Sequence, residues 1–287
     1  MPTALVAWFS ITGTTRAAAE RVALGLRRGG FTADVVELSA RPGVALPEVP
    51  GDVDLLAVGS PVHYFRLPAP VSAWVRGLPR LDGVAALPFV LYATYIGGAG
   101  DELRRLLGER GCGDAGYRRL RGAGSYQPYA RRGWRFSPGR PDEHGLAAAE
   151  EWAARAARGL EPPPPPDGRF HWMYRLERAL FAPSLVPRLY APYFSADAAV
   201  CDGCGVCVKA CPSGNVAQDE RRGPPVWGRD CLVCLECLLR CPVDAVRSPA
   251  DWTVFRPFLE YNVRRGLSDP ALDKVPVRIE RGRIEEV

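Results

Sequence analysis

The amino-acid sequence predicts an α/β protein in two parts: a doubly wound parallel sheet of five strands, and then a small, cysteine-rich α+β domain. Two observations lead to this prediction. Short apolar segments alternate with segments of helical periodicity over the first 160 residues, and eight of the nine cysteines lie between Cys201 and Cys241. Strands that alternate with helices along a chain form parallel sheets with helices on both faces.

Each element of the predicted sheet has a local signal. The apolar segments predict five strands, and the segments between them predict helices, the first of which ends at Gly29 and Gly30. The strands are expected at residues 4–9, 33–38, 53–59, 88–94 and 117–124, and the helices at residues 14–28, 69–76, 101–109 and 142–158.

Length and composition narrow the class of protein. A chain of 287 residues suggests two domains, and 47% hydrophobic with 24% charged residues is typical of globular proteins rather than disordered or fibrous ones. No apolar run approaches the roughly 18 residues that cross a bilayer, and the first ten residues lack the basic start of a signal peptide. We expect a cytoplasmic protein. A net charge of +5 is too small to indicate nucleic-acid binding.

The cysteines form an internal repeat. Its first copy is Cys201-x2-Cys204-x2-Cys207-x3-Cys211-Pro212, and Cys231-x2-Cys234-x2-Cys237-x3-Cys241-Pro242 follows 30 residues later. This is the cysteine run of bacterial ferredoxins with two [4Fe–4S] clusters. Three cysteines at this spacing can wrap one cluster, and the fourth points to the other cluster.

The crossed arrangement predicts two ligand sets. They are Cys201, Cys204, Cys207 and Cys241 for the first cluster, and Cys231, Cys234, Cys237 and Cys211 for the second. Zinc and disulfides are the alternatives. Zinc needs only two Cys-x2-Cys knuckles, and clustered cysteines in a chain without a signal peptide favour metal over disulfides. Gly203 and Gly205 would allow the backbone to approach the inorganic sulfides, and residues 215–227 are expected to form a small hairpin.

A hydroxyl-rich loop follows the first predicted strand. Its sequence is Ser10-Ile11-Thr12-Gly13-Thr14-Thr15, and a helix comes next. Sheets of this class bind ligands at the carboxyl ends of their strands, where hydroxyls and N–H groups at a helix N-terminus can surround a phosphate. No lysine follows the glycine and no Gly-x-Gly-x-x-Gly is present, so triphosphate and dinucleotide loops are excluded. An ordinary helix N-cap is the alternative.

Two further loops lie at the same predicted edge. The loop after the third strand supplies Ser60, Pro61, Val62, His63 and Tyr64, and the loop after the fourth strand supplies Thr94, Tyr95, Gly97 and Gly98. Small and aromatic residues of this kind suit a flat ring. The aromatic residues could equally be core or rim residues.

These motifs together resemble known proteins. Residues 1–160 are similar to a flavodoxin, because Ser10, Thr12, Gly13, Thr14 and Thr15 match its flavin mononucleotide (FMN) phosphate loop and the two other loops resemble those that flank the isoalloxazine ring. With the dicluster ferredoxin motif, the chain resembles the bacterial flavodoxin–ferredoxin fusion proteins. The resemblance implies one FMN, held by the three loops, and two [4Fe–4S] clusters.

The resemblance also sets the expected domains. They are a flavodoxin-like domain at residues 1–160, a proline-rich linker and helical connector at 161–195, a ferredoxin domain at 196–250 and an extension at 251–287. The linker contains five consecutive prolines, 162–166. We expect the aromatic segment 171–194 to pack between domains rather than on a membrane, and Cys112 to be a buried free thiol.

Seven arginines and no acidic residue lie between Arg118 and Arg140. Aromatic residues are interleaved with them, as in some nucleic-acid-binding segments. Because the stretch follows the fifth strand, beside the expected flavin face, an acidic protein partner or an anionic substrate is a better candidate than nucleic acid. The alternative is a solvated loop.

The predicted function is electron transfer. Clusters carry single electrons and a flavin carries one or two, so one chain holding both can connect the two kinds of redox partner. We expect an oxidoreductase. A reductase of a quinone or other small molecule, fed by the ferredoxin domain, and a redox- or oxygen-sensing interaction protein are the alternatives. The sequence indicates no catalytic residue, donor or acceptor.

Overall fold

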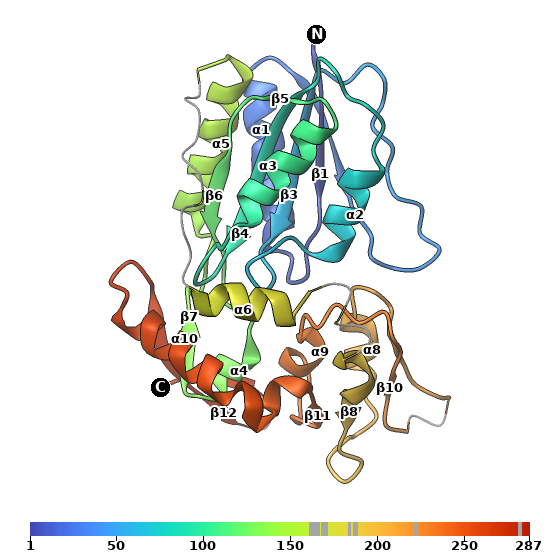
Figure 1. The fold of residues 1–287 in the computed structure, drawn as a ribbon, viewed down its shortest axis with the longest axis vertical. Helices are drawn as coiled ribbons and strands as arrows, with labels where there is room; N and C mark the ends of the chain where they lie inside the picture. Colours follow the sequence, from blue (N-terminus) through green and yellow to red (C-terminus); the bar gives the residue numbers. More distant parts are fainter. Residues whose placement is uncertain (161–166, 168–171, 183–184, 186–188, 221–222, 281–282) are drawn as a thin grey trace. The chain divides into compact units, whose positions relative to one another are not determined.

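The chain divides into two compact units. The computed structural model describes residues 1–160, 167, 172–182, 185, 189–220, 223–280 and 283–287, so the five prolines lie outside the described residues (Figure 1). One unit comprises Met1–Ser39, Val44–Ala123 and Gly139–Tyr174, and the other comprises Ala40–Gly43, Gly124–Pro138 and Arg175–Val287. The predicted domain boundaries remain predictions.

The first unit contains the predicted doubly wound sheet. The strand order is β2-β1-β3-β4-β5, β6 also pairs with β4, and every pairing in this sheet is parallel. This is the flavodoxin strand order. The strands are β1 (Thr3–Trp8), β2 (Thr32–Glu37), β3 (Leu55–Pro61), β4 (Ala85–Tyr92), β5 (Gly113–Asp114) and β6 (Arg118–Arg121). The predicted fifth strand corresponds to β6, and β5 adds a short second segment at the same edge.

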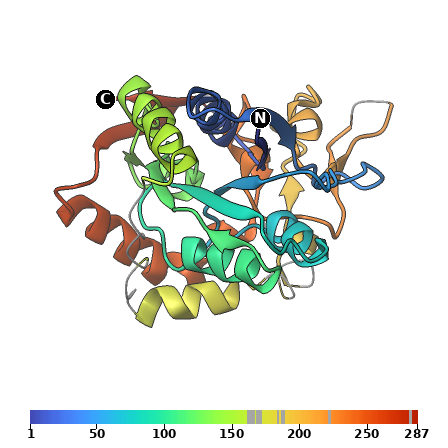
Figure 2. The same cartoon turned by 90° about the horizontal axis from the view of Figure 1, so that it is seen from above.

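Helices cover both faces of this sheet. Figure 2 shows α1 (Thr14–Arg28) and α5 (Glu143–Ala157) on one face, and α2 (Ala69–Gly77) and α3 (Ala99–Glu109) on the other. Two glycines allow α1 to approach α5 closely. A Cβ atom on Gly25 would lie 2.1 Å from the carbonyl oxygen of Glu150, and one on Gly29 would lie 2.3 Å from the Cβ of Ala157. Alanines and Trp152 of α5 complete this side of the core.

The cysteine segment of the second unit has short elements. Two antiparallel ladders pair β8 (Ser195–Ala196) with β11 (Val246–Arg247), and β9 (Val216–Ala217) with β10 (Val226–Trp227). The second ladder confirms the predicted hairpin. The third cysteine of each run lies in a short helix, α8 (Val206–Ala210) or α9 (Glu236–Leu239), and the two helices contact each other.

Residues 124–138 are part of the second unit, which the sequence analysis did not predict. They form α4 (Gln127–Ala130) and β7 (Trp134–Phe136). Strand β7 pairs with β12 (Lys274–Glu280), which pairs with β13 (Arg283–Glu286). The C-terminal residues therefore complete a small sheet whose first strand comes from the middle of the chain.

Two residues of the aromatic connector, Phe181 and Tyr190, pack within the second unit. Phe181 stacks on Tyr190 with ring centroids 4.9 Å apart, and both rings contact Phe255. The helical elements here are α6 (Trp172–Leu180), η1 (Ala191–Tyr193), η2 (Pro249–Asp251), η3 (Thr253–Phe255) and α10 (Arg256–Ser268). Each helix among the described residues is too short or too polar to span a bilayer.

Candidate cofactor sites

The two triple-cysteine loops have the same backbone conformation. Gly203 and Gly205 have φ values of 68° and 70°, and the residues at the equivalent positions, Val233 and Leu235, have φ values of 52° and 61°. This left-handed region suits glycine and strains a β-branched residue such as valine. Strain of this kind persists where the surrounding structure enforces it, often at a functional site. The second loop therefore keeps its wrapped shape without the glycines of the first.

The repeat extends beyond the fourth cysteine of each run. Gly214 and Asp244 are again equivalent, with φ values of 63° and 51°. These turns aim a backbone N–H at each fourth sulfur: Asn215 donates to Cys211 Sγ and Ala245 donates to Cys241 Sγ, both at 3.2 Å. Hydrogen bonds to cysteine sulfur stabilise the thiolate that binds iron and help to set the cluster potential.

The structure brings together the four cysteines predicted for the first cluster. Cys201, Cys204, Cys207 and Cys241 line one cavity together with Gly205, Val206 and Pro242. The pKa of Cys207 is raised, mainly by burial and further by the neighbouring Cys204 and Cys241. Thiols that interact across a shared cavity fit the crossed arrangement, in which Cys241 completes the set of the first run.

The second predicted set is also assembled. Burial raises the pKa of Cys231 to about 11, and the neighbouring Cys211 raises it further. Burial also raises the pKa of Cys237 to about 12, with Cys231 and Cys211 contributing, while a hydrogen bond from Trp227 lowers it. Buried thiols with such pKa values would be protonated alone, and a bound metal deprotonates them.

The donor chemistry of both sets fits a cluster. Each set supplies four cysteine thiols, which as thiolates are the ligands of a [4Fe–4S] cluster. Zinc also takes four thiolates, so the repeat with its crossed fourth cysteine, rather than the type of donor, favours clusters.

The loop after β1 folds around its own serine. Ser10 Oγ accepts hydrogen bonds from the N–H of Gly13 at 2.9 Å and from that of Thr15 at 3.3 Å. Gly13, with φ of 88°, is the N-cap residue of α1 and has no side chain that could cap the helix. Thr12 and Thr14 lie with their hydroxyls 3.3 Å apart. The loop thus gathers four of the predicted hydroxyl groups at a helix N-terminus.

Thr15 provides the test of whether this loop fits a phosphate. Its side chain is fully buried, and its Oγ1 has no hydrogen-bond partner among the described residues. A buried hydroxyl without a partner costs about 1–3 kcal/mol. A phosphate held at the N-terminus of α1 would supply the missing acceptor. The residues of this loop therefore fit the phosphate of FMN, and an N-cap alone does not explain Thr15.

The loop after β3 makes a tight turn. His63 and Arg66 exchange two backbone hydrogen bonds of 2.9 Å, with Tyr64 and Phe65 at positive φ between them. Ser60 is buried at the end of β3, and its hydroxyl donates to the carbonyl of Pro61 at 2.9 Å. Pro61, Val62, His63 and Tyr64 are half-buried, so part of each remains accessible at the carboxyl edge of the sheet.

The loop after β4 packs against this turn. A Cβ atom on Gly97 would lie 2.4 Å from the Cβ of Phe65, and the Gly98 N–H donates to the Phe65 carbonyl at 3.4 Å. Arg121 holds the start of the loop, because its Nη1 donates to the carbonyls of Ala93 and Thr94 at 3.2 and 3.0 Å. Thr94, Tyr95 and Gly98 are half-buried.

Phe65 and Arg121 position these two loops, although the sequence pattern does not single out either residue. The positive φ at Phe65 has no sequence signal, because such backbone strain is set by the surrounding structure. Arg121 was grouped with the arginine-rich stretch. Cys112, predicted to be buried, is half-buried, and burial together with Asp82 raises its pKa.

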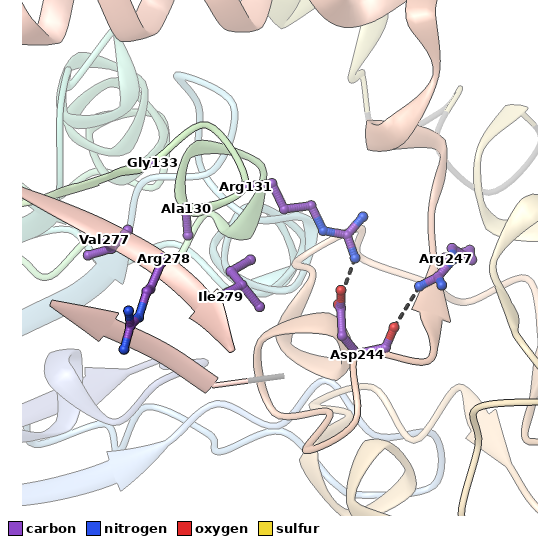
Figure 3. A pocket seen from close by; sticks show the side chains of 8 residues that line it. All are labelled: Ala130, Arg131, Gly133, Asp244, Arg247, Val277, Arg278 and Ile279. Carbon is purple, nitrogen blue, oxygen red and sulfur yellow. Dashed lines mark hydrogen bonds and ion pairs between the residues drawn. The ribbon is translucent and has the colours of Figure 1, made fainter. Parts of the chain in front are cut away.

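The arginine-rich stretch is divided between the two units. Arg118, Arg119 and Arg121 are in β6, while Arg131 belongs to the second unit. Arg131 donates to Asp244 at 2.8 Å and also pairs with Asp251, so its charge is matched within the chain. Figure 3 shows Arg131 and Arg247 converging on Asp244 at one end of an open cavity of about 610 Å³.

The cysteine segment matches a known domain family. Residues 200–246 match the family model described as the 4Fe-4S dicluster domain. No curated protein sequence matches the chain significantly.

Solved structures resemble the first unit at low identity. A flavodoxin from the domain Archaea is 18% identical, with 55% of this chain and 98% of that chain covered and a TM-score of 0.41. Flavodoxin 1 from Bacillus cereus is 16% identical, with 55% and 99% covered and a TM-score of 0.41. Rubredoxin oxygen:oxidoreductase from Desulfovibrio gigas is 16% identical, with 55% and 36% covered and a TM-score of 0.41.

The fold of the first unit is identified by its own strand order, and the second unit by its cysteine repeat. The chain therefore joins a parallel sheet in the flavodoxin order to a 4Fe-4S dicluster domain.

Proposed function

We propose that this chain is an iron–sulfur flavoprotein that transfers electrons between two [4Fe–4S] clusters and FMN. The observation that carries the proposal is the presence, in one chain, of a dicluster cysteine repeat and a flavodoxin-order sheet. The phosphate-type loop of this sheet buries a threonine hydroxyl, that of Thr15, that has no hydrogen-bond partner in the described part of the chain. When bound, the clusters would exchange single electrons and the flavin one or two.

The residues that would hold each group follow from the two sites. The first cluster takes Cys201, Cys204, Cys207 and Cys241, and the second takes Cys231, Cys234, Cys237 and Cys211. Ser10, Thr12, Gly13, Thr14 and Thr15 would hold the FMN phosphate. The half-buried residues after β3 and β4 would flank its ring. Covalent linkage keeps the two redox units at high effective concentration.

An external redox partner completes the proposal. The arginine-rich stretch offers less free charge than its sequence suggests, because Arg131 is paired within the second unit and Arg121 holds a loop. We therefore propose a redox partner, protein or small molecule, without assigning its docking site to these two residues. The protein is proposed to act in the cytoplasm.

Composition tests the proposal first. The full chain, purified without oxygen, is expected to contain about eight irons, eight sulfides and one FMN. Cys234→Ser is expected to lose about half of the iron and to keep the flavin. Iron without flavin in the unaltered protein would contradict the proposal and leave residues 10–15 as a helix N-terminus only. One zinc or two in place of iron would refute the cluster assignment.

A further inference from the structure

The two halves of the cysteine repeat differ at one buried position. Val206 and Glu236 are equivalent residues, each between the second and third cysteine of its run and each the first residue of a helix. Val206 is half-buried, whereas Glu236 is 2% exposed. The repeat thus places a carboxyl group beside the second cysteine set and an apolar side chain beside the first.

The carboxyl group of Glu236 is only partly satisfied. Its Oε1 accepts a hydrogen bond from Nε of Arg240 at 2.7 Å, and its Oε2 is buried without a partner among the described residues. The side chain of Arg240 is 54% exposed, so water screens the positive charge more than the negative one. Burying a half-satisfied carboxylate costs stability, and an apolar residue would avoid that cost, as Val206 does.

We propose that Glu236 lowers the reduction potential of the cluster held by Cys231, Cys234, Cys237 and Cys211, and so makes the two clusters electrostatically inequivalent. The proposal rests on the proposed function, because it assumes a cluster at this set. The step concerned is the gain of one electron by this cluster from an external reductant, with no bond formed or broken. Added negative charge is disfavoured beside a buried carboxylate, and local charge is one of the levers on cluster potential.

A purely structural role is the alternative for the same contacts. In that case Glu236 and Arg240 would form an ion pair that fastens α9, and either partner could be removed with the same result. The electrostatic role predicts opposite results. Removing the negative charge of Glu236 favours reduction, and removing the positive charge of Arg240 disfavours it.

A redox titration of the full-length holoprotein, followed by electron paramagnetic resonance, tests the sign. Glu236→Gln is expected to raise the potential of one cluster by at least about 59 mV, a tenfold change in its oxidised-to-reduced ratio. Arg240→Met is expected to produce a smaller shift downward. Glu236→Asp, which keeps the charge, is expected to keep the potential close to that of the unaltered protein.

The internal repeat supplies an independent variant. Val206→Glu places the carboxyl group at the first set and is expected to lower the potential of the other cluster. Equal potentials in Glu236→Gln and the unaltered protein, or shifts of the same sign in Glu236→Gln and Arg240→Met, would overturn the proposal. These results concern the potentials alone. The absence of iron or of flavin reduction in the unaltered protein would instead count against the proposed function.

Discussion

At the scale of single residues, the most informative group is the Thr15 hydroxyl, because no hydrogen bond among the described residues uses it. Thr15 Oγ1 is buried and has no hydrogen-bond partner among the described residues, whereas Ser10 Oγ in the same loop accepts hydrogen bonds from two N–H groups. The two residues therefore have separable roles. Ser10 shapes the loop with or without a ligand, and Thr15 would act on a bound phosphate.

Thr15→Val should accordingly weaken FMN binding without destabilising the flavin-free protein. Loss of one hydrogen bond to a charged phosphate corresponds to about 1.5–3 kcal/mol, or roughly tenfold to a hundredfold in the dissociation constant. Ser10→Ala is the matched variant and should lower the melting temperature even without flavin. Fluorescence titration and thermal unfolding measure the two effects. Unchanged FMN affinity in Thr15→Val would show that the hydroxyl does not face the phosphate.

A second residue-scale prediction concerns pH. Glu177 is 7% exposed, accepts a hydrogen bond from Asn262 Nδ2 at 2.9 Å, and has a pKa raised by burial from 4.5 to about 7. Asn262 Oδ1 is buried and has no hydrogen-bond partner among the described residues. Because the pKa of Glu177 is raised in the folded state, the protonated side chain contributes to the free energy of unfolding. This contribution is complete below about pH 4.5 and is lost as the pH rises through about 7.

Glu177→Gln removes this loss, because a neutral amide carries no charge that burial would penalise at any pH. Relative to the unaltered protein, the variant should gain stability as the pH rises, by up to about 3 kcal/mol well above pH 7. Melting temperatures at about pH 5 and about pH 8.5 measure the difference. Glu260→Gln, which alters an exposed ion pair on α10, should show no such gain on the alkaline side. A pH-independent difference for Glu177→Gln would refute a titration near neutrality.

At the scale of elements, the segment between β6 and α5 supports the cluster loops. Gln127 and Arg131 both donate to Asp244, the residue whose positive φ aims the Ala245 N–H at Cys241. Side chains from the middle of the sequence thus fix the turn that follows the last cysteine. Gly214 occupies the position after the first cysteine run that Asp244 occupies after the second. It needs no such side-chain support, because glycine adopts the left-handed conformation freely.

Arg131→Met should therefore loosen the turn at Asp244. We expect a loss of about 1–3 kcal/mol for a half-buried, charge-assisted network and faster loss of iron to a chelator. Arg132→Met is the control, because Arg132 donates to the carbonyl of Pro128 within its own helix segment. Chelation kinetics and thermal unfolding separate the two variants. Equal rates of iron loss would show that the contact with Asp244 is incidental.

Elements with local signals could be predicted from the sequence. Helix α1 has the predicted residues, because its apolar spacing and the glycines at its end are both local. The cysteine sets followed from their spacing. The insertion at 124–138 could not be predicted, because β7 is three residues long and gains its partner, β12, from almost 140 residues away. Arg131 belongs to a stretch that is basic in sequence, because its acidic partners, Asp244 and Asp251, lie more than 100 residues further along the chain.

The candidate site also contains residues that a local sequence motif predicts and residues that it does not. The phosphate-type loop was predicted because hydroxyls and a glycine at a strand end form a contiguous motif. Glu236 was not singled out, because a glutamate in a short helix normally indicates an exposed position. Its significance depends on its burial, since Glu236 is only 2% exposed in the folded chain, and the sequence does not reveal this. The left-handed backbone at Val233 and Leu235 likewise contradicts their local preferences.

At the scale of the whole molecule, each unit carries its own candidate site. The first unit is stabilised by the sheet with its covering helices, and the second by short ladders and the cysteine loops. The loops of the second unit are too short to bury much apolar surface, so cluster binding should contribute substantially to their folding. In the proposed function, electron transfer couples the two units.

The most direct measurement is the rate of flavin reduction in the holoprotein after rapid, oxygen-free reduction of the clusters. The account predicts that the flavin absorbance bleaches at a rate independent of protein concentration, and that Cys234→Ser slows this phase. A rate proportional to protein concentration would show that electrons pass only between molecules. A flavin that stays oxidised beside reduced clusters would contradict electron transfer within the chain.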